Sequence, residues 1–369
     1  MSPGFTAADH EMMARALRLA KLGLYSTTPN PRVGCVIVND GQIVGEGWHR
    51  RAGEAHAEVH ALRAAAGRAR GATAYVTLEP CSHHGRTPPC TDALLTAGVR
   101  RVVVAMTDPN PLVAGQGLAG LRAAGVLAEE GLLMAEAREL NIGFVARMTR
   151  ARPWLRMKVA ASLDGKTALH NGVSQWLTSA DARQDGHRWR ARACALLTGI
   201  GTVRQDDPQL NVRGVEGFSS DSRQPLKVVV DSRLELALDA RLLHGGGGVL
   251  VAAAVADRAR IAALGQVGAE VLLLPGPDGR VDLVALLAEL ARRGINEVHA
   301  EAGFRLSGTL LAAGLVDELL LYLAPCLVGD AARGMFDLPA LQSLAGKRSL
   351  LIRDLRSLGP DLRLLARFA

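Results

Sequence analysis

The feature that most constrains the fold is a repeated alternation of short apolar runs with amphipathic segments. In the first half of the chain, residues 33–38, 74–78 and 101–106 have the length and apolar composition of strands. Segments with apolar positions at helical spacing lie around them, at residues 9–23, 57–66, 91–97, 117–124 and 132–140. Alternating strands and helices predict an α/β fold in three layers, a sheet between two layers of helices.

The alternation of strands and helices resumes after a change of composition near residue 150. Residues 147–153, Arg-Met-Thr-Arg-Ala-Arg-Pro, are basic and aperiodic, so we expect a linker there. The predicted domains cover residues 1–146 and 154–369. In the second domain we expect strands at 155–160, 195–198, 227–231, 248–253, 270–274, 297–300 and 318–323, and helices at 180–191, 282–292 and 304–313.

Composition excludes several classes of protein. Of the 369 residues, 49% are apolar and 21% charged, which are the proportions of a globular protein with a sizeable core. The longest apolar run, 249–256, is far shorter than the ~20 residues that cross a bilayer. The first residues lack the pattern of a signal peptide, so we expect a cytoplasmic protein. The net charge of +7 is dispersed along the chain, which permits nucleic acid as a partner and also suits phosphorylated small molecules.

Five cysteines in so long a chain do not indicate a disulfide framework, which leaves metal binding or catalysis as their use. His56 and Glu58 open a predicted helix, Cys81 follows a strand, and Cys90 opens another helix. One imidazole and two thiolates leave a fourth zinc position for water, the pattern of a catalytic site. We therefore predict His56, Cys81 and Cys90 as ligands of a zinc ion that activates water.

Glu58 is the predicted catalytic residue, because a carboxylate beside the site can carry a proton from that water to a departing nitrogen. Side chains two residues apart on a helix point ~200° apart. His56 and Glu58 can therefore meet one water only above the helix N-terminus.

Other histidines and another class of zinc protein remain open at this point. The order His-Ala-Glu-Val-His differs from the H-E-x-x-H pattern of metalloproteases, so we interpret His60 as a core residue or a neighbour of the ligands. His83 and His84 lie between the two cysteines and are either alternative ligands or pocket residues. A zinc-stabilised binding module is the competing interpretation, although structural zinc usually has four protein ligands.

These motifs resemble the zinc nucleobase deaminases, whose signature is H-x-E followed by P-C-x-x-C. Here eight residues separate the two cysteines, in PCSHHGRTPPC. That spacing, with TPNPRVGCVIV and HAEVHAL upstream, is similar to the deaminase half of the bifunctional deaminase–reductases of riboflavin biosynthesis. We expect Asn30, before Pro31, to hydrogen-bond the substrate. A deaminase acting on a base in tRNA or single-stranded DNA is the alternative.

The second half contains no complete dinucleotide-binding fingerprint, because Arg204 stands where the third glycine is needed. The blocks RMKVAASLDGKTA, GVSQWLTSADAR, RARACALLTGIGTVRQDDPQLNVR and HAEAGFRLSGTLLAAGLVDEL nevertheless resemble the reductase half of the same family. The resemblance thus covers nearly the whole chain. It implies a cytidine-deaminase-like α/β/α domain followed by a dihydrofolate-reductase-like α/β domain that uses NADPH.

The resemblance also implies two sets of contacts in the second half. The cofactor contacts are Ala160, Trp176, Thr202, Asp206, Ser232, Gly303, Phe304, Arg305, Leu306, Ser307, Gly308 and Thr309. The substrate contacts are Ser174, Arg190, Leu210, Arg213 and Glu301. Two arginines suit a sugar phosphate, and a glycine turn that opens a helix suits the cofactor pyrophosphate. Phe304-Arg305 departs from the family's more usual Pro-Thr.

The function implied by the resemblance has two steps. A zinc-dependent hydrolysis would remove the 2-amino group of 2,5-diamino-6-(5-phosphoribosylamino)pyrimidin-4-one. An NADPH-dependent reduction would then convert the ribosyl group to ribityl, giving 5-amino-6-(5-phosphoribitylamino)uracil. We expect one Zn²⁺ per chain, a phosphorylated pyrimidine as substrate, neither nucleic acid nor membrane as partner, and a homo-oligomer.

Overall fold

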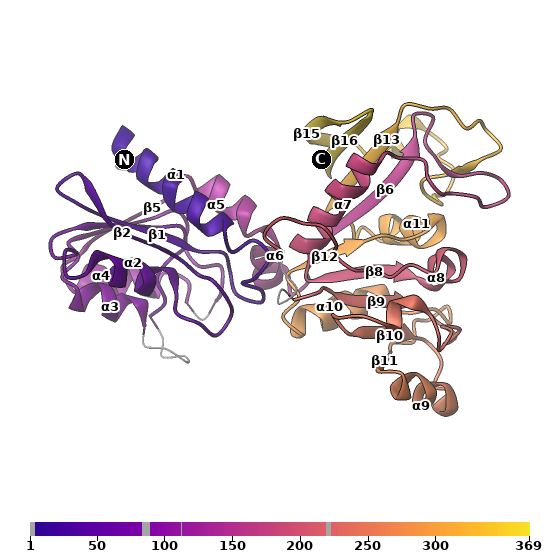
Figure 1. The fold of residues 1–369 in the computed structure, drawn as a ribbon, viewed down its shortest axis with the longest axis horizontal. Coiled ribbons are helices and arrows are strands. Elements are labelled where there is room, and N and C mark those ends of the chain that lie inside the picture. Colours follow the sequence, from indigo (N-terminus) through magenta and orange to yellow (C-terminus); the bar gives the residue numbers. More distant parts are fainter. Residues whose placement is uncertain (1–3, 83–88, 112, 219–222) are drawn as a thin grey trace. The chain divides into compact units, whose positions relative to one another are not determined.

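The computed structural model describes residues 4–82, 89–111, 113–218 and 223–369. Its contacts divide the chain into two compact units, Met1–Ala151 and Arg152–Ala369, drawn in Figure 1 from indigo to purple and from magenta to yellow, respectively. No helix in the part that the structure describes is long and apolar enough to span a membrane.

The first unit is built on a five-stranded sheet in the order β2-β1-β3-β4-β5. Strand β1 runs antiparallel to β2 and β3, whereas β3, β4 and β5 are parallel. The strands are β1 Gly34–Asn39, β2 Gln42–Trp48, β3 Thr73–Val76, β4 Arg101–Val104 and β5 Leu127–Glu130. The helices are α1 Ala7–Lys21, α2 Ala57–Ala65, α3 Cys90–Thr96, α4 Gln116–Ala123, α5 Met134–Leu140 and α6 Ile142–Arg150.

Two apolar cores cover the two faces of this sheet, which makes the predicted three layers. One core contains Ala61 of α2, Leu94 of α3 and Leu121 of α4. The other contains Leu17 of α1 and Phe144 of α6, among others. Helix α2 lies very close to β2, because a Cβ on Gly47 would lie 2.5 Å from the carbonyl oxygen of Ala57. The missing side chain at Gly47 lets the start of α2 settle against the sheet.

The second unit contains a nine-stranded sheet in the order β11-β10-β9-β8-β12-β6-β13-β16-β15. Strands β11 to β13 in this order are parallel, and β16 and β15 add antiparallel strands at one edge. The strands are β6 Trp154–Ser162, β8 Ala195–Gly199, β9 Leu226–Val230, β10 Val249–Ala253, β11 Ala269–Leu273, β12 Glu297–Ala300, β13 Glu318–Ala324, β15 Leu350–Leu358 and β16 Asp361–Phe368, with β7 Lys166–Ala168 and β14 Arg333–Gly334 pairing separately.

Every residue of β8 and β10 is buried, as expected for parallel strands covered on both faces. The helices of this unit are α7 Ala180–Arg192, α8 Ile200–Asp206, α9 Arg258–Gln266, α10 Leu283–Arg292 and α11 Phe304–Ala312. The expected strands of the second domain all form, and none of their ends shifts by more than two residues.

A buried charged cluster joins α7 to this sheet. The fully buried Arg156 of β6 makes ion pairs with Glu318, at 2.5 Å, and with Glu297, at 3.3 Å. Its guanidinium also lies 4.3 Å from the ring centre of Trp189 on α7, and Arg192 of the same helix contacts Glu297 at 2.8 Å. Removing one partner of such a cluster leaves an uncompensated buried charge. The cluster therefore fixes α7 against the sheet.

The structure differs from expectation at several places, among them β5 and α6, which were not predicted. Residues 147–150, which we expected in a linker, form the last turn of α6, and Ala151 ends the helix in a left-handed conformation with φ of 51°. The buried residues of α6 are 143–146, and the basic residues follow them. Residues 147–150 therefore show no apolar periodicity that would indicate a helix. The hairpin of β15 and β16 was not predicted at all.

Candidate functional sites

Three predicted metal ligands of the first unit lie together. The Nδ1 atom of His56 is 3.3 Å from the Sγ atom of Cys90 and 3.6 Å from that of Cys81. The three ligand atoms all lie within 4.8 Å of one another. An imidazole and two thiols at this separation form a donor set that suits zinc and leaves one coordination position for water or substrate. The residues present therefore fit the implied metal.

Two helix N-termini meet at this cluster. His56 is the residue before α2, with φ of −75° and ψ of 167°, and Cys90 is the first residue of α3. This arrangement places the cluster above the start of α2, where the sequence required a water shared by His56 and Glu58 to lie. The positive ends of the two helix dipoles favour thiolate over thiol.

The electrostatics of the cluster favour a thiolate at Cys81. Hydrogen bonds from Cys90 and His56 lower the pKa of the Cys81 thiol, and the backbone N–H of Cys90 donates to the same sulfur at 3.4 Å. Glu58 is 3% exposed, and burial raises the pKa of its carboxyl to about 7. A group with that pKa can both accept and donate a proton at neutral pH.

Asn30 is linked to the cluster through a histidine that sequence reasoning missed. The Nδ2 atom of Asn30 lies 3.1 Å from Nε2 of His49, and Nδ1 of His49 lies 3.2 Å from the carbonyl oxygen of Ala55. The ring of His49 packs edge-on against His56, with centroids 5.4 Å apart. His49 follows β2 in the sequence and belongs to no motif that we considered. His60 is outside the cluster, and His83 and His84 lie outside the described residues.

Glu79 is a second residue that the motifs did not reveal. Its buried carboxylate accepts hydrogen bonds from four backbone N–H groups, at 2.8 to 3.1 Å, which belong to Asp108, Gly115, Gly117 and Leu118. The segment before α4 and the first turn of α4 are thereby tied to Glu79, two residues ahead of Cys81. Glu79 supports the ligand position without touching the cluster.

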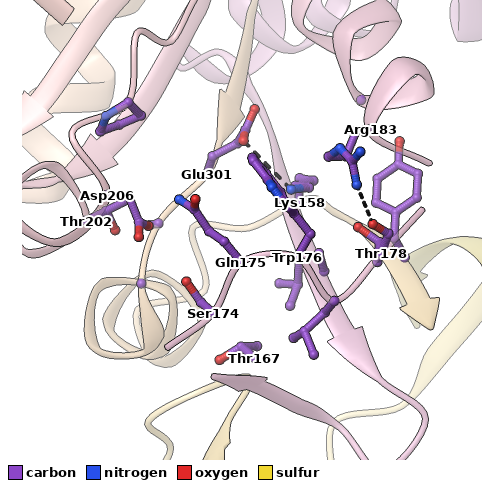
Figure 2. Close-up of a pocket in the computed structure, with 18 of the residues that line it drawn as sticks. Lys158, Thr167, Ser174, Gln175, Trp176, Thr178, Arg183, Thr202, Asp206 and Glu301 are labelled. Atoms are coloured by element: carbon purple, nitrogen blue, oxygen red, sulfur yellow. Dashed lines mark hydrogen bonds and ion pairs between the residues drawn. The ribbon is translucent and has the colours of Figure 1, made fainter. Parts of the chain in front are cut away.

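The second unit contains a cavity of about 650 Å³ between β6, α7, α8 and the segment that follows β12. Figure 2 shows Lys158 and Glu301 close together, with Thr202 and Asp206 on another side of the space. The predicted residues that line the cavity are Ala160, Ser174, Trp176, Arg190, Thr202, Asp206, Leu210, Arg213, Glu301, Gly303 and Phe304. The lining residues that the sequence analysis missed include Lys158, Gln175, Arg183, His187 and Tyr322.

The other predicted cofactor residues do not line this cavity. Ser307 is buried and donates to the carbonyl oxygen of Ala302 at 3.2 Å. Gly308 packs against backbone, because a Cβ there would lie 2.0 Å from the carbonyl oxygen of Asp337. The Ser232 hydroxyl accepts a hydrogen bond from the N–H of Val281 at 3.2 Å. The remaining residues outside the lining are Arg305, Leu306 and Thr309.

The start of α11 fits a phosphate group of the implied NADPH. Gly303 precedes the helix and no side chain caps it, so the first N–H groups of α11 lack a capping acceptor. A Cβ on Gly303 would lie 3.3 Å from the hydroxyl of Thr202. A side chain at this position would therefore narrow the space through which a phosphate reaches these N–H groups. An uncapped helix N-terminus behind a glycine is suited to a pyrophosphate.

Glu301 is the centre of a charged group in the cavity wall. Arg190 donates to it from Nε and from Nη2, the latter at 2.8 Å, and Lys158 lies 3.8 Å away. Burial raises the pKa of the Glu301 carboxyl, but the charges of Arg190 and Lys158 outweigh burial and hold this pKa well below its usual range. Arg190 also donates to the carbonyl oxygen of Asn211 at 3.2 Å, whereas the exposed Arg213 donates to Gln209 at 3.1 Å.

A second set of polar groups surrounds Asp206 at the end of α8. Burial raises the pKa of the Asp206 carboxyl, and hydrogen bonds from Ser174 and Gln175 oppose that rise. The ring of Trp176 is 71% exposed, and the Arg183 guanidinium lies 4.7 Å from its centre. The cavity thus has a cationic region near Arg190, and the exposed ring of Trp176 forms part of its wall.

Comparisons with known proteins agree on both halves. The model of the RibD C-terminal domain matches residues 153–364, and that of the cytidine and deoxycytidylate deaminase zinc-binding region matches residues 6–106. The chain is 49% identical to the riboflavin biosynthesis protein RibD of Escherichia coli K12, over 96% of this chain and 97% of that protein. It is 44% identical to RibD of Haemophilus influenzae, over 98% and 97%.

Solved structures show the same likeness. Acinetobacter baumannii RibD, form 1, superposes with a TM-score of 0.92 at 44% identity, over 98% of this chain and 99% of that chain. The diaminohydroxyphosphoribosylaminopyrimidine deaminase/5-amino-6-(5-phosphoribosylamino)uracil reductase of Thermotoga maritima superposes with a TM-score of 0.86 at 31% identity, over the same shares. The cytidine-deaminase-like and dihydrofolate-reductase-like folds expected from the sequence are thereby confirmed. The chain belongs to the RibD family of riboflavin biosynthesis proteins.

Proposed function

We propose that this chain catalyses two successive steps of riboflavin biosynthesis, the deamination of 2,5-diamino-6-(5-phosphoribosylamino)pyrimidin-4-one and the reduction of its product to 5-amino-6-(5-phosphoribitylamino)uracil. The observation that carries this proposal is that one chain holds both a zinc-type donor set and a separate cavity suited to NADPH. The family relationship supports the same pair of activities.

In the deaminase unit, His56, Cys81 and Cys90 would hold zinc, which supplies a nucleophilic water at neutral pH. Glu58 accepts the proton from that water and delivers it to the nitrogen that leaves as ammonia, a role supported by its burial next to the ligand cluster. Asn30, held by His49, hydrogen-bonds the pyrimidine.

In the reductase unit, the cavity residues would hold NADPH, which when bound would supply a hydride for the reduction of C1′ of the ribosyl group. Thr202, Asp206 and Gly303 line the cavity and would contact the cofactor, while Ser174 and Leu210 would contact the nucleotide. Glu301 is oriented by Arg190 and faces the same space. The cavity is not lined by the remaining predicted cofactor contacts, which are Ser232 and residues 305–309. A cofactor that contacts them would have to extend beyond the cavity.

The purified protein provides a direct test. Ammonia should be released from the diaminopyrimidine nucleotide and not from an RNA hairpin that carries an unpaired cytosine and an unpaired adenine. Release from the hairpin alone would replace the proposal with a nucleic-acid deaminase. Binding of zinc without ammonia release from either substrate would favour a zinc-stabilised binding module.

We also propose that the protein acts in the cytoplasm as a homo-oligomer, with a second copy paired at β15. This strand is the last of the sheet, and Leu351, Ile352 and Leu355 on it are 55%, 61% and 57% exposed. An exposed apolar edge strand is a template for pairing with another strand, and a two-fold axis would bring two copies of β15 together antiparallel. Sedimentation should show a dimer for the native chain and a monomer for Ile352→Lys. A monomeric native chain would refute this pairing.

A further inference from the structure

One histidine in the cavity wall has no part in the function proposed above. His187 and Arg190 lie three residues apart on α7, so their side chains share one face of the helix. Both line the cavity, as does Arg213 from the chain beyond α8. The Nδ1 atom of His187 is buried and has no hydrogen-bond partner among the described residues. An unsatisfied buried nitrogen in the wall of a cavity that two arginines also line indicates a polar ligand.

The groups that face His187 make it neutral in the empty cavity. Burial and the positive charges of Arg190 and Arg213 lower the pKa of the imidazole to about 4, and Glu301 and the carbonyl of Asn211 oppose this shift. Glu301 accepts hydrogen bonds from Nε and Nη2 of Arg190 and offsets part of its charge. Arg213 donates to the neutral side chain of Gln209 and keeps a net positive charge toward the cavity.

A phosphate monoester is the ligand that this arrangement suits. Its charge at neutral pH is about −1.5 to −2, and its oxygens only accept hydrogen bonds. A neutral imidazole offers one N–H donor and one lone pair that would repel an oxygen anion, whereas the protonated ring offers two donors. An anion between His187 and Arg213 would offset the two guanidinium charges that now exclude the proton.

We infer that His187, together with Arg213, binds the 5′-phosphate of the nucleotide and takes up one proton from solvent as the anion enters. Arg190 then serves mainly to hold Glu301, which revises the expectation that Arg190 and Arg213 form the phosphate clamp. The identity of the nucleotide rests on the proposed function, but the anion site and its proton uptake do not. Hydrogen bonds to an anion from a charged donor are about twice as strong as neutral ones, which is why the proton enters with the ligand.

Calorimetry with the full-length protein can detect this proton. Inorganic sulfate is the probe, because it remains a dianion near neutral pH and so contributes no proton change of its own. The heat of sulfate binding is measured at pH 6.5 in two buffers that differ in ionisation enthalpy, and the difference gives the number of protons taken up. The variants are His187→Asn and His187→Gln, with His244→Asn as a control because His244 does not line the cavity.

The native protein and the His244→Asn control should both take up close to one proton per sulfate bound. Both His187 variants should bind sulfate about 10-fold or more weakly and take up no proton, since a lost hydrogen bond to a charged group has this effect. The KM of the reductase for its nucleotide should rise likewise, with the KM for NADPH unchanged. Unaltered NADPH binding in the His187 variants shows that the cavity is folded.

Two results would overturn the inference. The first is sulfate binding by the native protein without proton uptake, and the second is the same uptake in the native protein and both His187 variants. If the protein instead shows proton uptake that depends on His187 but never reduces the nucleotide, the proposed function fails and this anion site stands.

Discussion

Replacing Arg190 by lysine should damage the reductase in a different way from replacing Arg213. Arg190 donates to Glu301 from two nitrogens and to Asn211 from a third, and its side chain is only 17% exposed. Lysine keeps the positive charge but has no planar fork, so it cannot hold both oxygens of Glu301. Arg213 is exposed and donates to Gln209, so the Arg213→Lys variant leaves Glu301 in place.

The size of the effect follows from the hydrogen bonds that lysine cannot make. A hydrogen bond to a charged group contributes about 1.5–3 kcal/mol, and the Arg190→Lys variant lacks at least one of these. The expected loss is therefore about 10- to 100-fold in kcat/KM for the nucleotide. Because Glu301 also loses its orientation, much of this loss should fall on kcat. In the Arg213→Lys variant the loss should fall on KM.

The assay follows NADPH oxidation with the deaminated nucleotide as the varied substrate. The KM for NADPH and the rate of ammonia release in the other unit serve as internal controls, and both should stay within about twofold. The reasoning would be refuted if Arg190→Lys raised only the KM for NADPH. A kcat unchanged in Arg190→Lys and lowered in Arg213→Lys would show that the two roles are reversed.

Three further predictions concern the other residues and the division of the chain. Cys81→Ala and Cys90→Ala should each lose zinc in metal analysis, and full retention in either would remove that cysteine from the ligand set. Glu58→Gln cannot accept a proton, so it should keep zinc and reductase activity while ammonia release falls by about 10²- to 10⁴-fold; near-normal release would end the proton-transfer role. A fragment that starts at Arg152, which pairs with Asp317 at 2.7 Å, should fold and reduce the deaminated nucleotide without releasing ammonia, and a folded fragment unable to bind NADPH would contradict the assignment of this unit.

The deaminase site could be predicted from the sequence because local signals determine its parts. His56 lies just before α2 and Cys90 begins α3, and both helix starts can be recognised from the chain alone. The order of the motifs along the chain, which resembles that of the deaminases, then indicated that these distant residues come together in the fold. His49 carried no such signal, because its approach to Asn30 depends on how the chain after β2 returns to the segment before β1.

In the reductase unit, the alternating pattern predicted most strands of the sheet. It could not predict which charged side chains form ion pairs. Glu301 and Arg190 are 111 residues apart and meet only because α7 packs over β12. The turn at residues 147–150 was wrongly assigned because its arginines lie on the open side of α6, after the buried residues that define the helix. Strand β15 was not predicted, because both of its faces are exposed and its sequence therefore does not alternate between apolar and polar residues.

A two-stage assay tests the central claim, that one chain performs both reactions in order. The native protein is incubated with the diaminopyrimidine nucleotide without NADPH until ammonia release stops, and NADPH is then added. The account predicts one equivalent of ammonia in the first stage and one equivalent of NADPH oxidised in the second, with the ribityl product identified by mass. NADPH oxidation with the diamino nucleotide before any ammonia appears, or ammonia release that never leads to NADPH oxidation, would contradict it.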